Sequence, residues 1–152
     1  MLAATLAHKP KTWSDISYSG VRFKTITLAE NCEEYLAISN KFHNRRITKI
    51  ERIQHPFAYG RFILKKDQLK LEGYDYITED TVFHSIDVAD KYVAIEYNCD
   101  PRRYSGRYKG TTPTFRSTPD SSANIIIVLQ KLQQSNQESD ADYYPTYIVE
   151  LD

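Results

Sequence analysis

Apolar and polar positions alternate along several parts of the chain, and this alternation predicts strands. Residues 21–27 alternate apolar with basic side chains, residues 46–54 are rich in β-branched residues, and residues 81–84 form a short run of the same kind. Residues 125–129 read Ile-Ile-Ile-Val-Leu, which is apolar on both faces and therefore predicts a central strand. Residues 144–151 are predicted to form the last strand.

Apolar residues at helical spacing lie between these strands. Thr27 and Glu30 have the spacing of a capping box, so we expect a helix across residues 28–42. A proline suited to a first helical turn opens a second predicted helix over residues 57–69. A third helix is expected over residues 87–97.

The remaining segments are rich in turn-forming or polar residues. Residues 98–123 are predicted to be a loop, and residues 133–142 an exposed turn or disordered loop. We expect residues 1–20 to be a loosely structured lead-in and residues 21–152 to form one domain. The fold class predicted is α+β, with mixed or antiparallel central sheets, flanking helices and a core sheet built from the late strands.

The chain has 152 residues, with 20 basic and 20 acidic side chains, so its formal net charge is zero. Zero net charge argues against nucleic-acid binding through a positive charge spread over the whole domain. The charge is uneven, however, because residues 41–70 contain nine lysines and arginines against Glu51 and Asp67. Twelve tyrosines add large rings with polar tips, which suit sheets, interfaces and stacking surfaces.

The sequence offers no zinc spacing around Cys32 and Cys99, no apolar run long enough to span a membrane, and no signal peptide. We therefore expect an intracellular protein, nuclear or cytoplasmic, that binds neither a metal nor a membrane. A disulfide between the two cysteines stays open at this point.

Residues 47–62, followed by Lys65-Lys66, read I-T-K-I-E-R-I-Q-H-P-F-A-Y-G-R-F, and this segment resembles catalytic domains of the poly(ADP-ribose) polymerase family. In that family a strand of the form I-x-x-I-x-R-I-Q-N-P leads into a helix that carries paired lysines. Residues 82–85, 98–102 and 144–149 resemble later motifs of the same domain. The resemblance is closest to the mono-ADP-ribosylating branch that holds the TCDD-inducible polymerase and the zinc-finger antiviral protein, and it implies an ADP-ribosyltransferase-like fold.

The resemblance implies transfer of ADP-ribose from NAD, at a site with three family positions. His84 matches the histidine that holds the ribose, and Ile148 falls where polymerising members have glutamate and mono-transferases have an apolar residue. Thr114 takes the place of the tyrosine that stacks on nicotinamide, and threonine has no π face. Two alternatives stay open, since Tyr108 or Tyr104 could supply the ring, and a shifted register would replace Ile148 with Glu150.

Two further departures weaken the implied site. Ser85 stands where the family has a glycine whose backbone approaches the nicotinamide amide, and the chain between the histidine strand and the last strand is much shorter than in the family. The predicted NAD-contacting residues are therefore His84, Ser85, Tyr108 and Phe115, in a degenerate setting.

Three hypotheses follow. The first is a catalytically inactive transferase-like domain that binds a protein or RNA partner and needs no cofactor. The second is an active mono-ADP-ribosyltransferase, which would use NAD if the pocket is intact. The third is an RNA-binding module in which basic side chains contact phosphates, with these candidates: Arg45, Arg46, Lys65, Lys66, Arg102, Arg103 and Lys109.

Overall fold

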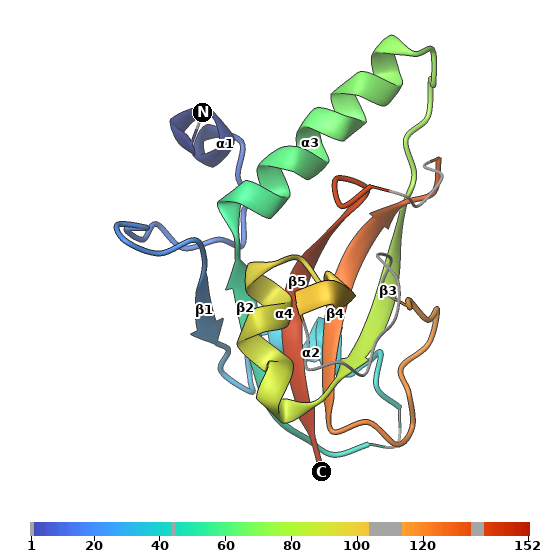
Figure 1. Cartoon of the computed structure of the whole chain (residues 1–152). Helices are drawn as coiled ribbons and strands as arrows, with labels where there is room; N and C mark the ends of the chain where they lie inside the picture. The colour runs from blue at the N-terminus through green and yellow to red at the C-terminus, as the bar shows by residue number, and fades with distance from the viewer. Residues whose placement is uncertain (1, 44, 104–113, 135–138) are drawn as a thin grey trace.

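The computed structural model describes residues 2–43, 45–103, 114–134 and 139–152, and its centre is one five-stranded sheet (Figure 1). The strand order is β1-β2-β5-β4-β3, and every neighbouring pair is antiparallel. The strands are β1 (Lys24–Thr27), β2 (Ile47–Gln54), β3 (Glu79–Ile86), β4 (Ile125–Leu132) and β5 (Tyr143–Leu151). This arrangement agrees with the predicted α+β class, with one antiparallel sheet in place of several.

Helices cover both faces of the sheet, as Figure 1 shows for α4 in front and α2 behind. Helix α3, which begins at a proline as predicted, runs diagonally across one end of the sheet and projects beyond it. The helices are α1 (Leu2–Ala7), α2 (Glu33–Ser39), α3 (Pro56–Leu71) and α4 (Lys91–Glu96), with 3-10 turns η1 (Val88–Asp90) and η2 (Pro101–Arg103). The helix predicted over residues 87–97 is therefore η1 followed by the short α4.

The core has three parts. On the α4 face, Ile127 and Ile148 are completely or almost completely buried with residues from β2 and α4. On the α2 face, Tyr35 and Ile38 pack on Ile50, Ile126 and Val149. Phe62 and Leu69 of α3 pack with Tyr144 in the third. The strand at 125–129 lies inside the sheet, as its apolar character predicted.

The structure corrects the predicted start of the first helix. Thr27 is the last residue of β1, and the Leu28 amide donates to the Ile50 carbonyl at 2.9 Å, so the chain is still part of the sheet where the capping box would begin a helix. Helix α2 begins at Glu33 instead. Its N-cap is Cys32, whose sulfur accepts a hydrogen bond from the Tyr35 amide at 3.3 Å.

The segment 1–20, expected to be loosely structured, contains helix α1 and is tied to the domain. Trp13 is 7% exposed and packs against Tyr59, with ring centroids 5.4 Å apart. The buried side chain of Gln54 accepts from the Ser14 amide at 2.8 Å and donates to the Ser14 carbonyl at 3.0 Å. Local sequence patterns cannot predict long-range contacts of this kind.

Candidate functional site

The strand register places His84 and Ile148, the first and last residues of the predicted site, in one row across the sheet. His84 of β3 lies opposite Ile127 of β4, and Ile127 lies opposite Ile148 of β5. Residues paired directly across neighbouring strands share a face, so His84 and Ile148 lie on the same side, under α4. The next residue in the row is Glu51 of β2.

His84 is 2% exposed, and the segment after residue 113 covers it. Its Nδ1–H donates to the carbonyl oxygen of Thr114 at 2.9 Å, and Phe115 presents its ring edge-on with centroids 6.0 Å apart. Burial lowers the pKa of His84, with the hydrogen bond to Thr114 opposing the shift. The imidazole is therefore neutral at pH 7, and its Nδ1 is engaged by the backbone.

Residues 114–116 extend the sheet beyond the edge strand. Phe83 and Arg116 exchange two backbone hydrogen bonds, each 2.9 Å long. Phe115 then packs on Tyr143 with ring centroids 4.8 Å apart. These contacts hold the segment against β3, so the sheet itself fixes the cover over His84.

The remaining family positions are distributed over both faces or lie outside the described residues. Ser85 is half-buried and lies opposite Ile126, so its side chain is on the α2 face, away from that of His84. The side chain of Thr114 is exposed, and its carbonyl, not its hydroxyl, contacts His84. Tyr104 and Tyr108, the alternatives for the stacking ring, lie outside the described residues.

A buried ion cluster lies beside Ile148, and no motif in the sequence indicates it. Lys91, the first residue of α4, has its Nζ 3.1 Å from Glu51 Oε2 and 3.0 Å from Glu150 Oε1. Their side chains are 8%, 6% and 26% exposed. Burial alone would lower the pKa of Lys91, but the hydrogen bonds that its ammonium donates to Glu150 and Glu51 outweigh burial and raise it. Glu150, the alternative to Ile148, is thus engaged by a lysine.

The matched segment around β2 makes contacts that hold the fold together. The Arg52 guanidinium donates twice to Glu34, at 2.6 and 2.9 Å, and the Tyr147 hydroxyl donates to the same carboxylate at 2.6 Å. His55, where the family has asparagine, caps α3 by accepting from the Ala58 amide at 3.2 Å. Burial lowers the pKa of His55 to about 4.

The basic residues proposed for RNA are mostly engaged inside the protein. Lys66 pairs with Glu79 at 2.7 Å, and Lys65 lies 3.9 Å from Asp142. The Arg45 guanidinium donates to the carbonyls of Asp120, Ala123 and Asp152. Arg46 lies 3.4 Å from the Asp152 carboxylate.

The candidates near the 98–103 turn are engaged in the same way. Arg102 pairs with Asp100 at 2.6 Å, and the Arg103 guanidinium lies 4.6 Å from the centroid of the Tyr97 ring. Lys109 lies outside the described residues. The described candidates are therefore in contact with groups of the chain itself, although Arg46 and Arg102 are 82% and 65% exposed and their surface pairs are weak.

Other kinds of site find little support in the described part of the chain. Cys32 and Cys99 form no disulfide with each other. Within residues 2–43, 45–103, 114–134 and 139–152, no group of three or more His, Cys, Asp or Glu side chains could hold a metal ion. In the same residues no helix combines the length and the apolarity that crossing a membrane requires.

Comparison with known proteins supports the family resemblance in part. Over 102 residues the chain is 29% identical to the human protein mono-ADP-ribosyltransferase PARP14. This alignment covers 64% of the chain. The aligned region is 6% of the length of that protein. No model of a protein family matches the sequence. This similarity supports a PARP-like relationship. The structure itself is mixed α/β, with a five-stranded antiparallel sheet.

Proposed function

We propose that this chain is a catalytically inactive, ADP-ribosyltransferase-like domain that acts as a protein-interaction module. One observation carries the proposal. The histidine at the family's ribose position is 2% exposed and donates to the Thr114 carbonyl, beneath a segment that is hydrogen-bonded to the sheet edge. A ribose hydroxyl could accept from this Nδ1–H only by displacing the Thr114 carbonyl.

The described residues do not fit NAD at this position. Ile148 is 1% exposed, and the place of the stacking tyrosine is taken by an exposed threonine. Beside Ile148, Glu51 and Glu150 share Lys91, and Glu51 also lies 3.6 Å from Lys49, so both carboxylates are paired with lysines rather than left to stabilise positive charge on a sugar. We therefore derive no transfer step for this chain.

The same structure favours a protein over RNA as the partner. Arg45, Lys65, Lys66 and Arg102 all contact carboxylates or carbonyls of the chain itself. RNA binding would have to break these contacts. A binding constant that falls steeply with salt, measured with a single-stranded RNA, would favour RNA and count against this part of the proposal.

Calorimetry with NAD tests the inactive state directly. We expect no saturable heat up to about 2 mM NAD, a range that would detect weak affinities near 1 mM. The variants are His84→Ala and, as a matched control, His43→Ala, which removes an exposed histidine. Circular dichroism verifies that both fold. Saturable binding that is lost in His84→Ala and kept in His43→Ala would refute the proposal, as would NAD-dependent labelling with the same pattern.

A further inference from the structure

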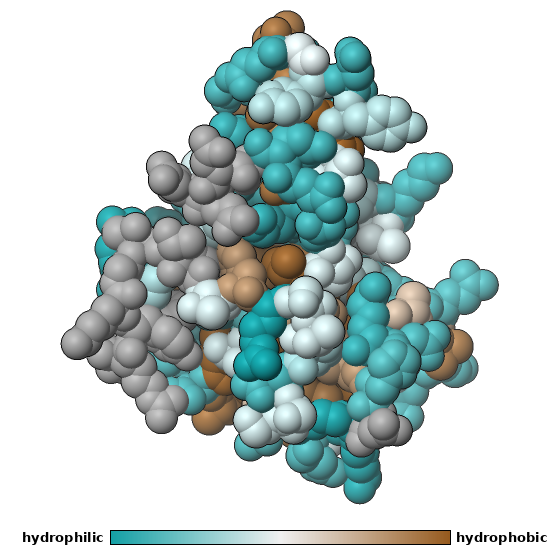
Figure 2. Space-filling model, turned by 90° about the vertical axis from the view of Figure 1, so that its right-hand side faces the viewer, coloured by the Kyte–Doolittle hydropathy of each residue, from teal (hydrophilic) through white to brown (hydrophobic). Residues whose placement is uncertain are grey.

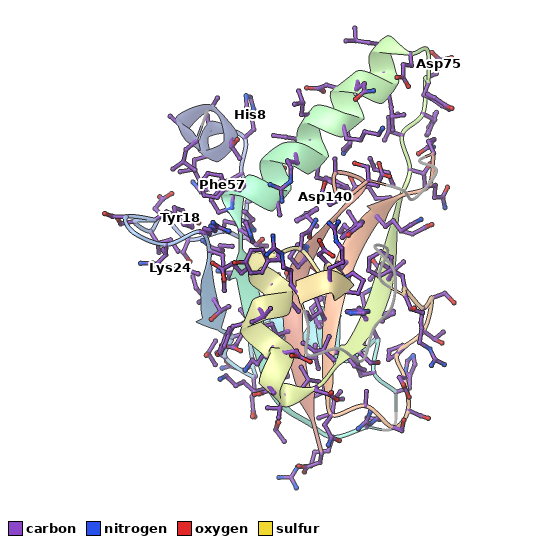
Figure 3. The ribbon with its side chains drawn as sticks, in the orientation of Figure 1. His8, Tyr18, Lys24, Phe57, Asp75 and Asp140 are labelled. Atoms are coloured by element: carbon purple, nitrogen blue, oxygen red, sulfur yellow. The ribbon has the colours of Figure 1, made fainter. Side chains whose placement is uncertain are left out.

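Strand β3 is one edge of the sheet, and only part of this edge is covered. Phe83 exchanges two backbone hydrogen bonds with Arg116 on the side away from β4. Backbone groups of alternate residues point to the same side of a strand, so the N–H and C=O groups of Thr81 and Glu79 also point outward. Within the described residues, no hydrogen bond reaches these groups from outside the sheet. Figure 3 shows Asp75 at the turn through which the chain enters β3, so the uncovered edge lies between that turn and Arg116.

A hollow of about 490 Å³ lies beside this edge. The side chains of Thr81 and Phe83 line it, and Phe83 packs in the core on the α2 face, so the hollow opens on that face of the sheet. Figure 2 views the molecule from the side of β3 and shows apolar surface between hydrophilic side chains on that side. The other lining residues come from the segments that follow α2 and Arg116: Lys41, Phe42, His43, Arg45, Ser117, Thr118, Pro119 and Ser121.

The hollow is positively charged. Lys41 and Arg45 carry its charges, His43 can add a third, and no lining residue is Asp or Glu. Neither Lys41 nor His43 forms an ion pair with a described residue. The Arg45 guanidinium donates to three backbone carbonyls, which hold it in place without neutralising it. The hollow therefore attracts an anion.

The acids that neighbour the hollow in the sequence have cationic partners of their own. Glu79, two residues before Thr81, pairs with Lys66 at 2.7 Å. Asp120 stands between two lining residues and lies 3.6 Å from Arg116. An anion in the hollow therefore meets cations and hydroxyl groups and no unpaired carboxylate among the described residues.

The lining fits one kind of anion, a phosphate carried on an aromatic ring. Phe42 and Phe83, which are 3% and 4% exposed, form an apolar base, whereas Lys41 and His43 are exposed at the rim. A phosphate monoester carries about −1.5 to −2 charges and three acceptor oxygens, so several donors can bind it at once, whereas a carboxylate offers two oxygens and one charge. The ring of phosphotyrosine would also cover the apolar base. Three further lining residues have hydroxyl groups that can donate: Ser117, Thr118 and Ser121.

We propose that this domain binds a phosphotyrosine-containing segment of a protein partner as an additional antiparallel strand at the β3 edge. The phosphotyrosine lies opposite Thr81, continuing the pairing that Arg116 makes with Phe83, and its N–H and C=O bond the outward C=O and N–H of Thr81. Residues directly opposite each other share a face of the sheet, so its side chain enters the hollow, where the phosphate meets Lys41 and the hydroxyl groups. Two residues later, the segment pairs with Glu79 in the same way.

This inference rests on the proposed role in protein interaction and identifies the chemistry of the partner. It does not involve His84, whose side chain lies on the opposite face of β3 from that of Phe83. NAD-dependent labelling would therefore refute the inactive state and leave this inference standing. A folded chain that does not bind the phosphopeptide would overturn the inference without making the domain an enzyme.

Fluorescence anisotropy with the intact chain tests the inference. The peptide contains, in order, threonine, phosphotyrosine, threonine, valine and threonine, with fluorescein at its C-terminus. We expect a dissociation constant of about 10–100 µM, because a short edge contact with one anchoring side chain buries little surface. The tyrosine form lacks the phosphate and the phosphoserine form lacks the ring, so each should bind roughly tenfold more weakly. No saturation up to about 1 mM protein, or a tyrosine or phosphoserine form that binds as tightly, would overturn the proposal.

Two charge-reversal variants locate the contact. Lys41→Glu replaces an exposed cation of the hollow and should weaken phosphopeptide binding roughly tenfold. Lys70→Glu, the matched control, makes the same change at an exposed lysine of α3 outside the hollow and should change the constant less than about twofold. Circular dichroism verifies that both variants fold. Equal effects of the two variants would contradict the assigned hollow.

N-methylated peptides test the added strand without altering the protein. In the proposed register the N–H of the peptide valine faces the Glu79 carbonyl, and the N–H of the threonine before it faces away from β3. Methylating the valine nitrogen should weaken binding roughly tenfold, whereas methylating that threonine nitrogen should weaken it less than about threefold. Equal losses would rule out strand addition. A single-stranded RNA that displaces the labelled peptide at lower concentration than the unlabelled peptide does would assign the hollow to nucleic acid and overturn the proposed partner.

Discussion

Replacing Lys91 by methionine should strongly destabilise the protein. The lysine is the cation between Glu51 and Glu150, and its side chain and that of Glu51 are 8% and 6% exposed. Removing one partner of a buried ion pair costs about 3–5 kcal/mol, because the other charge is left in the interior without that partner. Glu51 would still have Lys49 at 3.6 Å and the Thr25 hydroxyl at 3.1 Å, which reduces the cost. Glu150 is 26% exposed and can take up water, so we expect a value near the lower end, about 3 kcal/mol.

Urea unfolding followed by the fluorescence of Trp13, the single tryptophan, measures this change. With a slope of about 2 kcal/mol per molar urea, the midpoint should fall by roughly 1.5 M. Adding Glu51→Gln to Lys91→Met should recover about 2 kcal/mol of the free energy of unfolding, since it removes the more buried of the two carboxylates that have lost Lys91. Lys70→Met, at an exposed position, should change stability by less than about 0.5 kcal/mol.

The pH dependence follows from the raised pKa of Lys91. A cation whose folded pKa lies above the ordinary 10.5 contributes its full stability below that value and loses it only as pH rises through the folded pKa. The difference between wild type and Lys91→Met should therefore be constant from pH 7 to 9. A midpoint within about 0.3 M of wild type, or a double variant no more stable than the single one, would refute the argument.

Three further outcomes test the local structure. Burial lowers the pKa of His55 to about 4, so the residue is neutral in the folded protein and its contribution to the free energy of unfolding is complete above pH 6.5 and is lost as pH falls. Between pH 7.5 and 5 the free energy of unfolding, measured by urea titration, should fall by about 2 kcal/mol more in wild type than in His55→Asn. Gly60→Ala should add nearly 1 kcal/mol in a Thr5→Ala background and distinctly less in wild type, which a thermal double-mutant cycle measures. Tyr147→Phe should cost about 1.5 kcal/mol at pH 7. Burial raises the pKa of Glu34, but the hydrogen bonds from Arg52 and Tyr147 outweigh burial and lower it, so the cost should stay constant until pH falls through this lowered pKa and should shrink only there; a cost that is the same on both sides of the Glu34 titration would contradict this.

Local patterns in the sequence determined most of the secondary structure. The strands at 46–54, 125–129 and 144–151 and the helix that begins at Pro56 all form where the sequence predicts them. Side-chain alternation and helical spacing are properties of a few consecutive residues, so they survive in any fold that buries one face of each element. The capping box at Thr27 failed because a backbone bond from Leu28 to the distant Ile50 keeps that stretch in the sheet.

The sequence also marked His84 and Ile148 through their motifs and offered Glu150 as the alternative to Ile148. The register pairs Ile148 with Ile127 and Glu150 with Ile125, so the two residues lie on one face. It could not show that the carbonyl of Thr114 engages the imidazole. Nor could it find the pairing of Lys91 with Glu51, because these residues come from elements far apart in the chain.

The difference between what the sequence predicts and what only the tertiary structure decides has one physical cause. Whether a segment is a helix or a strand depends mainly on its own residues and on which side becomes buried. Strand register, the cover over a buried ring and the pairing of buried charges depend on contacts between distant segments, and these form only when the whole sheet closes. The sequence therefore determined most of the elements and carried the resemblance that singles out His84 and Ile148, whereas the tertiary structure alone decided that the histidine is enclosed and which residues of α3 stay exposed.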